Sequence, residues 1–100
     1  MLIASLAGEV DMTNAASVRE QLTSAVPSEA DALVVDLTEA RYLDSAAIEV
    51  LFELSRRLVR RRQQLRLVVP RRSPLRRLFT LIDLGSVVPV HDSLETAVAV

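Results

Sequence analysis

The segment Leu43-Asp44-Ser45 is where residue types and spacing best support chemistry in this sequence. It enters a strongly helical stretch, so the serine hydroxyl lies near unpaired backbone N–H groups and the positive end of a helix dipole. Both features favour a bound phosphate. Two interpretations stay open at this point. Ser45 is the N-cap of the helix, which is the usual role of a serine there, or it is a residue that carries a phosphate.

Arginines form a second candidate site. Residues 55–82 contain ten arginines and no acid, whereas residues 1–54 contain ten acids and two arginines. Such a cluster could bind nucleic acid or an acidic partner. The alternative is a solvated face with cations near a helix C-terminus. We favour the solvated face and expect no nucleic-acid partner, because no aromatic or groove-reading motif accompanies the arginines.

The composition excludes several kinds of catalytic site. The chain has no cysteine, so disulfides, thiolate metal sites and cysteine nucleophiles are absent. His91 is the single histidine, which argues against a histidine metal site or a Ser-His triad. The two glycines, Gly8 and Gly85, cannot build a phosphate-binding loop. We therefore predict a protein that is not an enzyme and has neither a cofactor nor a metal of its own.

The arrangement of apolar residues predicts one α/β domain over residues 1–100. Strands and helices alternate, which predicts a mostly parallel or mixed central sheet of four or more strands flanked by about four helices. The predicted strands are Leu2–Leu6, Ala32–Leu37, Gln64–Val69 and Val87–Val90. The Ala32–Leu37 run is almost continuously β-prone, so Val34 and Val35 should lie in a central strand. Pro89 places the last strand at an edge.

Helix signals separate these strands. One predicted helix starts at Thr13 as N-cap, and a second covers Ala46 to about Arg62 with Val59 on its buried face. A third follows Ser73-Pro74 and is ended by Gly85, and a last short helix has Asp92 as its N-cap. Tyr42 to Ser45 are expected in a connection. No apolar run is long enough to span a membrane and no signal peptide is evident, so we expect a cytoplasmic protein without membrane insertion.

Several segments together resemble the STAS domain family, of the anti-sigma factor antagonist type. They occur in the expected order along nearly the whole chain, and the family's usual first strand is either missing or reduced to the few residues before Gly8. The segments are Gly8-Glu9-Val10-Asp11, Val34-Val35-Asp36-Leu37, Tyr42-Leu43-Asp44-Ser45, Ile48 with Val50-Leu51, Pro74-Leu75-Arg76-Arg77-Leu78-Phe79 and Asp92-Ser93-Leu94-Glu95.

The resemblance implies a phosphorylation switch. Antagonists of this type bind an anti-sigma factor that is a serine kinase of the GHKL type, and phosphorylation of a serine that follows an aspartate dissociates the complex. By position, Ser45 would be the phosphoacceptor, and Asp11, Asp44, Ala46 and Glu49 would contact the partner together with it. The output would be regulated transcription, ATP would belong to the kinase, and self-association stays open.

The sequence departs from the family pattern just after Ser45. Ala46 stands where the family has a second serine, and Ala47 and Glu49 stand where it has glycines. Fewer glycines leave less room for a partner's backbone, and Glu49 would repel a phosphate on Ser45. The alternative function is therefore a STAS-like subunit that is not phosphorylated, in a stressosome-type scaffold or as a lipid-transport accessory protein.

Overall fold

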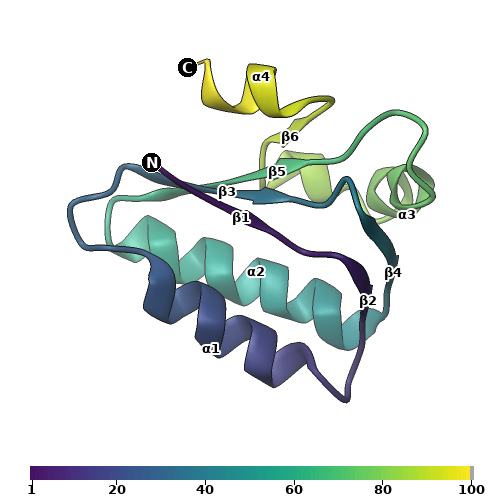
Figure 1. The fold of residues 1–100 in the computed structure, drawn as a ribbon, viewed down its shortest axis with the longest axis horizontal. Helices are drawn as coiled ribbons and strands as arrows, with labels where there is room; N and C mark the ends of the chain where they lie inside the picture. The colour runs from purple at the N-terminus through teal and green to yellow at the C-terminus, as the bar shows by residue number, and fades with distance from the viewer. Residues whose placement is uncertain (100) are drawn as a thin grey trace.

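The structure, a computed structural model, describes residues 1–99 as an α/β fold (Figure 1). The strands are β1 (Leu2–Ser5), β2 (Gly8–Val10), β3 (Ala32–Asp36), β4 (Ala40–Leu43), β5 (Gln64–Val68) and β6 (Val90–His91). The helices are α1 (Ala15–Ala25), α2 (Ser45–Arg60), α3 (Leu75–Leu81) and α4 (Leu94–Val98), with a short 3-10 turn, η1 (Leu84–Ser86).

The main sheet has four parallel strands in the order β1-β3-β5-β6. In β3, Val34 pairs with Ile3 of β1 on one side and with Arg66 of β5 on the other. Val34 and Val35 are fully buried. The apolar run is continuous because helices cover both faces of this strand, so neither side of it meets water. The predicted α/β class and the predicted central strand are confirmed.

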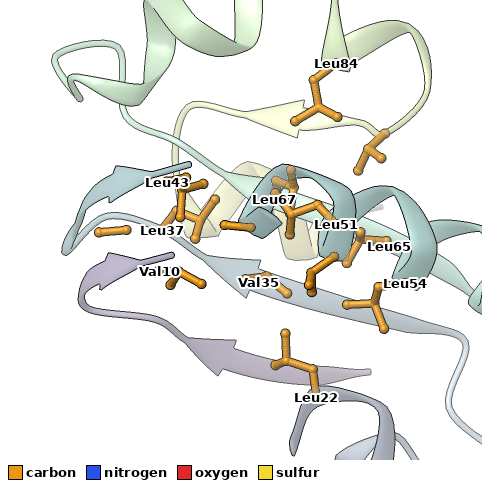
Figure 2. Close-up of a cluster of buried hydrophobic side chains, with 14 of the residues drawn as sticks. Val10, Leu22, Val35, Leu37, Leu43, Leu51, Leu54, Leu65, Leu67 and Leu84 are labelled. Atoms are coloured by element: carbon orange, nitrogen blue, oxygen red, sulfur yellow. The ribbon is translucent and has the colours of Figure 1, made fainter. Parts of the chain in front are cut away.

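Helices α1 and α2 cover one face of the sheet, and the short α4 lies on the opposite face (Figure 1). Side chains from α1, α2 and the strands meet in the main core, including Leu22, Leu51 and Val35 (Figure 2). The face under α4 has only a small buried cluster of Val34, Val68 and Ala97. Most of the apolar burial that stabilises the fold therefore depends on α1 and α2.

A second ladder, between β2 and β4, is absent from the sequence-based prediction. Gly8 has φ +75°, a conformation that glycine adopts without strain, at the point where the chain enters β2. Its N–H donates to the carbonyl of Glu39 at 2.9 Å. Strands of three and four residues are too short to show a periodic pattern, and the predicted connection at Tyr42 is in fact part of β4.

Two predicted helix starts are wrong. Asn14, and not Thr13, precedes the first residue of α1. Ser93, and not Asp92, caps α4 by accepting from the N–H of Thr96, because Asp92 is engaged by Arg71 and Arg76 at 2.8 and 2.7 Å. Those bonds, the one from Arg71 first, hold the pKa of Asp92 below its ordinary value.

The other differences lie at the ends of predicted elements. Gly85 does not end α3, since α3 stops at Leu81 and Asp83 takes the left-handed conformation with φ +54°. The last strand is only Val90–His91, although it is at the edge as predicted. In α2, Val59 is 65% exposed, because it falls at the margin of the buried stripe and no element within residues 1–99 covers it.

The buried face of α2 can be tested by one pair of substitutions. Leu54 is 1% exposed in the core, so Leu54→Ala should lower the free energy of unfolding by about 2–5 kcal/mol through lost burial and the resulting cavity. Val59→Ala, on the same helix but exposed, should change it by less than about 0.5 kcal/mol. Urea titration followed by circular dichroism measures both. Equal effects would contradict the orientation of α2.

Candidate functional site

The parallel pairing of β2 with β4 brings two distant acidic residues to one edge. Val10 and Leu43 are register partners at the carboxyl ends of these strands, and the next residues are Asp11 and Asp44. The N–H of Asp44 donates to the carbonyl of Val10 at 3.2 Å, which extends the ladder by one bond. Asp11 and Asp44 therefore leave the ladder side by side.

The Asp44 carboxylate links the two segments. Its Oδ1 accepts from the N–H of Ala47 at 3.1 Å, and its Oδ2 accepts from the N–H of Met12 at 3.0 Å. The first bond caps α2, and the second holds the turn that leads into α1. One side chain thus fixes the start of α2 relative to the β2–α1 turn.

Ser45 is the first residue of α2, and its side chain is exposed. Because Asp44 caps the helix, the interpretation of Ser45 as the N-cap is wrong. The Ser45 hydroxyl has no hydrogen-bond partner within residues 1–99. The N–H groups of a helix's first turn have no partner inside the helix, so a group attached to this hydroxyl would lie beside backbone donors and the positive end of the dipole.

Asp11 shapes the turn that Asp44 holds. Its Oδ1 accepts from the N–H of Thr13 at 2.9 Å and from the Thr13 hydroxyl, and its own N–H donates to Oδ1 of Asn14 at 2.9 Å. The hydroxyl bond from Thr13, followed by its backbone N–H, lowers the pKa of Asp11. Asp11 is therefore ionised near neutral pH, and its side chain is partly exposed.

The residues that replace the family's serine and glycines lie on different sides of α2. Ala47 is 3% exposed and packs in the main core, so its methyl group points away from any partner. Ala46 and Glu49 line a shallow groove of about 240 Å³ between α1 and α2, together with Met12 and Ala16. Of these three substituted residues, Glu49 is thus the one whose side chain is exposed.

The structure adds two residues that sequence reasoning missed. Met12 is 79% exposed next to Asp44, and Asn14 ties the turn together by donating to the carbonyl of Glu9 at 3.0 Å. The run Asp11 to Asn14 contains three polar residues suited to turns, which was the available signal. Nothing in the sequence showed that Asp44 would reach this turn from 32 positions away.

The predicted arginine cluster divides into two groups. Arg66, Arg71 and Arg76 have structural partners: Arg66 donates to the carbonyl of Ala97 at 2.9 Å, and the other two bind Asp92. The arginines on the second half of α2 are exposed and point into solvent. The solvated-face interpretation therefore describes only part of the cluster.

The part of the chain that the structure describes has neither a metal-binding cluster nor a membrane-spanning helix. Residues 1–99 contain no group of three or more His, Asp or Glu side chains placed to hold a metal ion. In the same range, no helix combines the length and the apolar character needed to cross a membrane.

The fold and site together define a small α/β protein with an exposed serine at a helix start. Comparison with known proteins identifies the family: a model of the STAS domain family matches residues 1–97. A candidate anti-sigma factor antagonist of Bordetella bronchiseptica, BtrV, is 33% identical over 99% of this chain and 84% of its own. The chain belongs to the STAS domain family and is related to anti-sigma factor antagonists.

Solved structures of such antagonists share the fold. An anti-sigma factor antagonist from Mycobacterium paratuberculosis is 25% identical, with a TM-score of 0.84 over 97% of this chain and 81% of that one. The antagonist SpoIIAA in its unphosphorylated form is 18% identical, with a TM-score of 0.71 over 94% of this chain and 81% of that one. The SpoIIAA comparison supports the fold alone.

Substitution of Asp44 tests its linking role. Asp44→Ala removes two acceptors and should lower the free energy of unfolding by about 0.5–2 kcal/mol, in the range of a lost helix cap. Amide exchange at Met12 and Ala47 should accelerate together. Ser45→Ala is the matched control and should stay within about 0.5 kcal/mol of the wild type. If Asp44→Ala changed the free energy of unfolding no more than this control, the two bonds would not hold the site.

The turn at Asp11 predicts a pH dependence. Its folded-state pKa is lowered, so the stability that Asp11 contributes is present above the unfolded pKa and is lost as pH falls through the folded value, below about pH 4. Thr13→Ala should raise the pKa of Asp11 toward its ordinary value, as measured by NMR titration of the carboxyl carbon. Thr80→Ala, whose hydroxyl bonds the carbonyl of Arg76 instead, should leave it unchanged.

Proposed function

We propose that this protein is an anti-sigma factor antagonist that binds an anti-sigma factor serine kinase of the GHKL type and is switched by phosphorylation of Ser45. In the unphosphorylated state it binds the kinase, so that the sigma factor is released and transcription proceeds. It acts by binding and not by catalysis, and its place of action is the cytoplasm. Family membership and the relation to BtrV support the class of protein.

The observation that carries the switch is the exposed Ser45 hydroxyl at the first position of α2. It is accessible to a kinase, and it is not engaged in capping because Asp44 performs that role. Asp11 and Asp44 follow the paired ends of β2 and β4 just before it, and Ala46 and Glu49 lie in the first turns of the same helix, so these residues would form the contact surface for the kinase.

Phosphorylation would act on the interface more than on the fold. A phosphoserine adds about −1.5 to −2 charges at neutral pH. The helix dipole stabilises that charge by about 0.3–1 kcal/mol, whereas the acids Asp44 and Glu49 oppose it. These opposing effects leave little net change in the isolated protein. A partner packed on this edge would instead have to desolvate the phosphate, which costs several kcal/mol unless a cation compensates.

Kinase treatment tests the switch. Incubation with the GHKL-type anti-sigma kinases of the same genome and ATP should modify Ser45, located by mass spectrometry, and phosphorylation should weaken binding by tenfold or more, since about 1.4 kcal/mol corresponds to a factor of ten. Ser45→Ala should keep the fold and kinase binding but abolish modification. Ser45→Asp should keep the fold and weaken binding less than a phosphate does.

Two outcomes would contradict the proposal. Modification at another residue would move the switch away from α2. A kinase that binds the protein tightly without modifying any residue would favour the alternative of an unphosphorylated subunit in a larger assembly. The nearby Ser17, exposed on α1, is a suitable control, since Ser17→Ala should leave the extent of phosphorylation unchanged.

A further inference from the structure

The exposed face of α2 changes charge along its length. At 3.6 residues per turn, Ser45, Glu49, Arg56 and Arg60 fall within about 60° of one another around the helix axis. The buried stripe of Leu51, Leu54 and Leu58 is on the opposite side. The exposed stripe therefore begins with a hydroxyl and a carboxylate and ends with two guanidinium groups.

The basic end of this stripe has little local compensation. Within residues 1–99, the side chains of Arg56, Arg57 and Arg60 have no hydrogen-bond or ion-pair partner, and together with Glu53 they border a shallow hollow of about 230 Å³. The carboxylate of Glu53 is bound to Arg19 of α1 at 3.3 Å and so is shared with another cation.

Like charges on one helix face repel one another. Arg56 with Arg60 is an i,i+4 pair and Arg57 with Arg60 an i,i+3 pair, both of equal sign. The helix C-terminus favours cations, but that effect fades beyond the last turn, and Arg56 lies before it. An acidic surface placed against these guanidinium groups would remove the repulsion.

The flanks of the stripe suit a protein partner. Val59 is 65% exposed beside Arg56 and Arg60, and Phe52, one turn before Arg56, is half-buried. Arginines next to accessible apolar side chains are frequent centres of protein interfaces. Nucleic-acid binding would instead favour fully exposed aromatic groups that stack on bases or an element that enters a groove, whereas the single aromatic side chain here, Phe52, is half-buried.

We propose that Arg56, Arg57 and Arg60 bind an acidic patch of the same kinase that reaches Ser45, so that the partner lies along α2. This inference rests on the proposed function. Arg56 and Arg60 are 11 and 15 positions from Ser45 along α2, which at 1.5 Å per residue is about 16 and about 22 Å. The partner would meet an acidic end and a basic end of one helix, and these opposite charges would fix its direction on the protein.

The test is charge reversal with a matched control. Arg56→Glu with Arg60→Glu should slow association with the purified kinase about tenfold or more at low salt, because steering by exposed charges acts on the association rate. The salt dependence of that rate should become shallower. Arg72→Glu with Arg77→Glu changes the net charge equally, at exposed positions outside α2, and should have a much smaller effect.

Phosphorylation kinetics separate docking from a loss of structure. In the Arg56/Arg60 variant the kinase should show a raised KM for this protein and an unchanged kcat, with modification still at Ser45. Thermal unfolding of both double variants should lie within several degrees of the wild type, since none of the four arginines has a hydrogen-bond or ion-pair partner within residues 1–99 and the helix dipole at Arg60 contributes only a small stabilisation.

The outcomes distinguish this inference from the proposed function. If the wild type is bound and phosphorylated but both double variants behave alike, the acidic-patch contact is wrong and the proposed function stands. If the wild type neither binds nor is modified, the proposed function fails and this contact with it. Binding of duplex DNA at physiological salt that is lost in the Arg56/Arg60 variant would also overturn the proposal.

Discussion

The parallel pairing of β2 with β4 is the constraint on which the candidate site depends. Parallel strands present their carboxyl ends at the same edge, so the residues that follow them, Asp11 and Asp44, must emerge together. A parallel pair also needs a long crossover connection, and here that connection includes α1 and β3. The Asp44 carboxylate then bonds across to the turn before α1, which gives the two segments one fixed relation.

Helix α2 combines three roles along 16 residues. Its buried stripe supplies much of the core, its first turn presents Ser45, and its last turns carry arginines that have no partner among residues 1–99. The core residues lie on one side of the helix and the exposed residues on the other. Ser45 and the arginines lie at opposite ends of the exposed side, so the three roles do not interfere with one another. A rigid helix with a packed face also keeps the serine and the arginines at a constant separation, which a loop could not do.

The substitutions relative to the family pattern differ in whether their side chains are buried or exposed. Ala47 directs its methyl group into the core, so the lost glycine there does not crowd the exposed edge. Glu49 does reach that edge and adds a negative charge beside Ser45. A partner adapted to this protein would therefore present a basic or neutral surface at Glu49, in line with the change of charge along α2. The fold is retained at low sequence identity, as the SpoIIAA comparison shows.

The sequence by itself determined the α/β class, the central position of Val34 and Val35, the approximate extent of α2 and the position of Ser45 at the start of that helix. These features are local: continuous apolar runs and 3.6-residue periodicity are written in neighbouring residues. Tertiary structure decided the β2–β4 ladder, the exposure of Val59, the bond from the Met12 N–H to Asp44 and the division of the arginines. Each of these depends on contacts between residues far apart in the chain, such as Met12 with Asp44 or Arg71 with Asp92, and no local pattern specifies which polar group will be the partner.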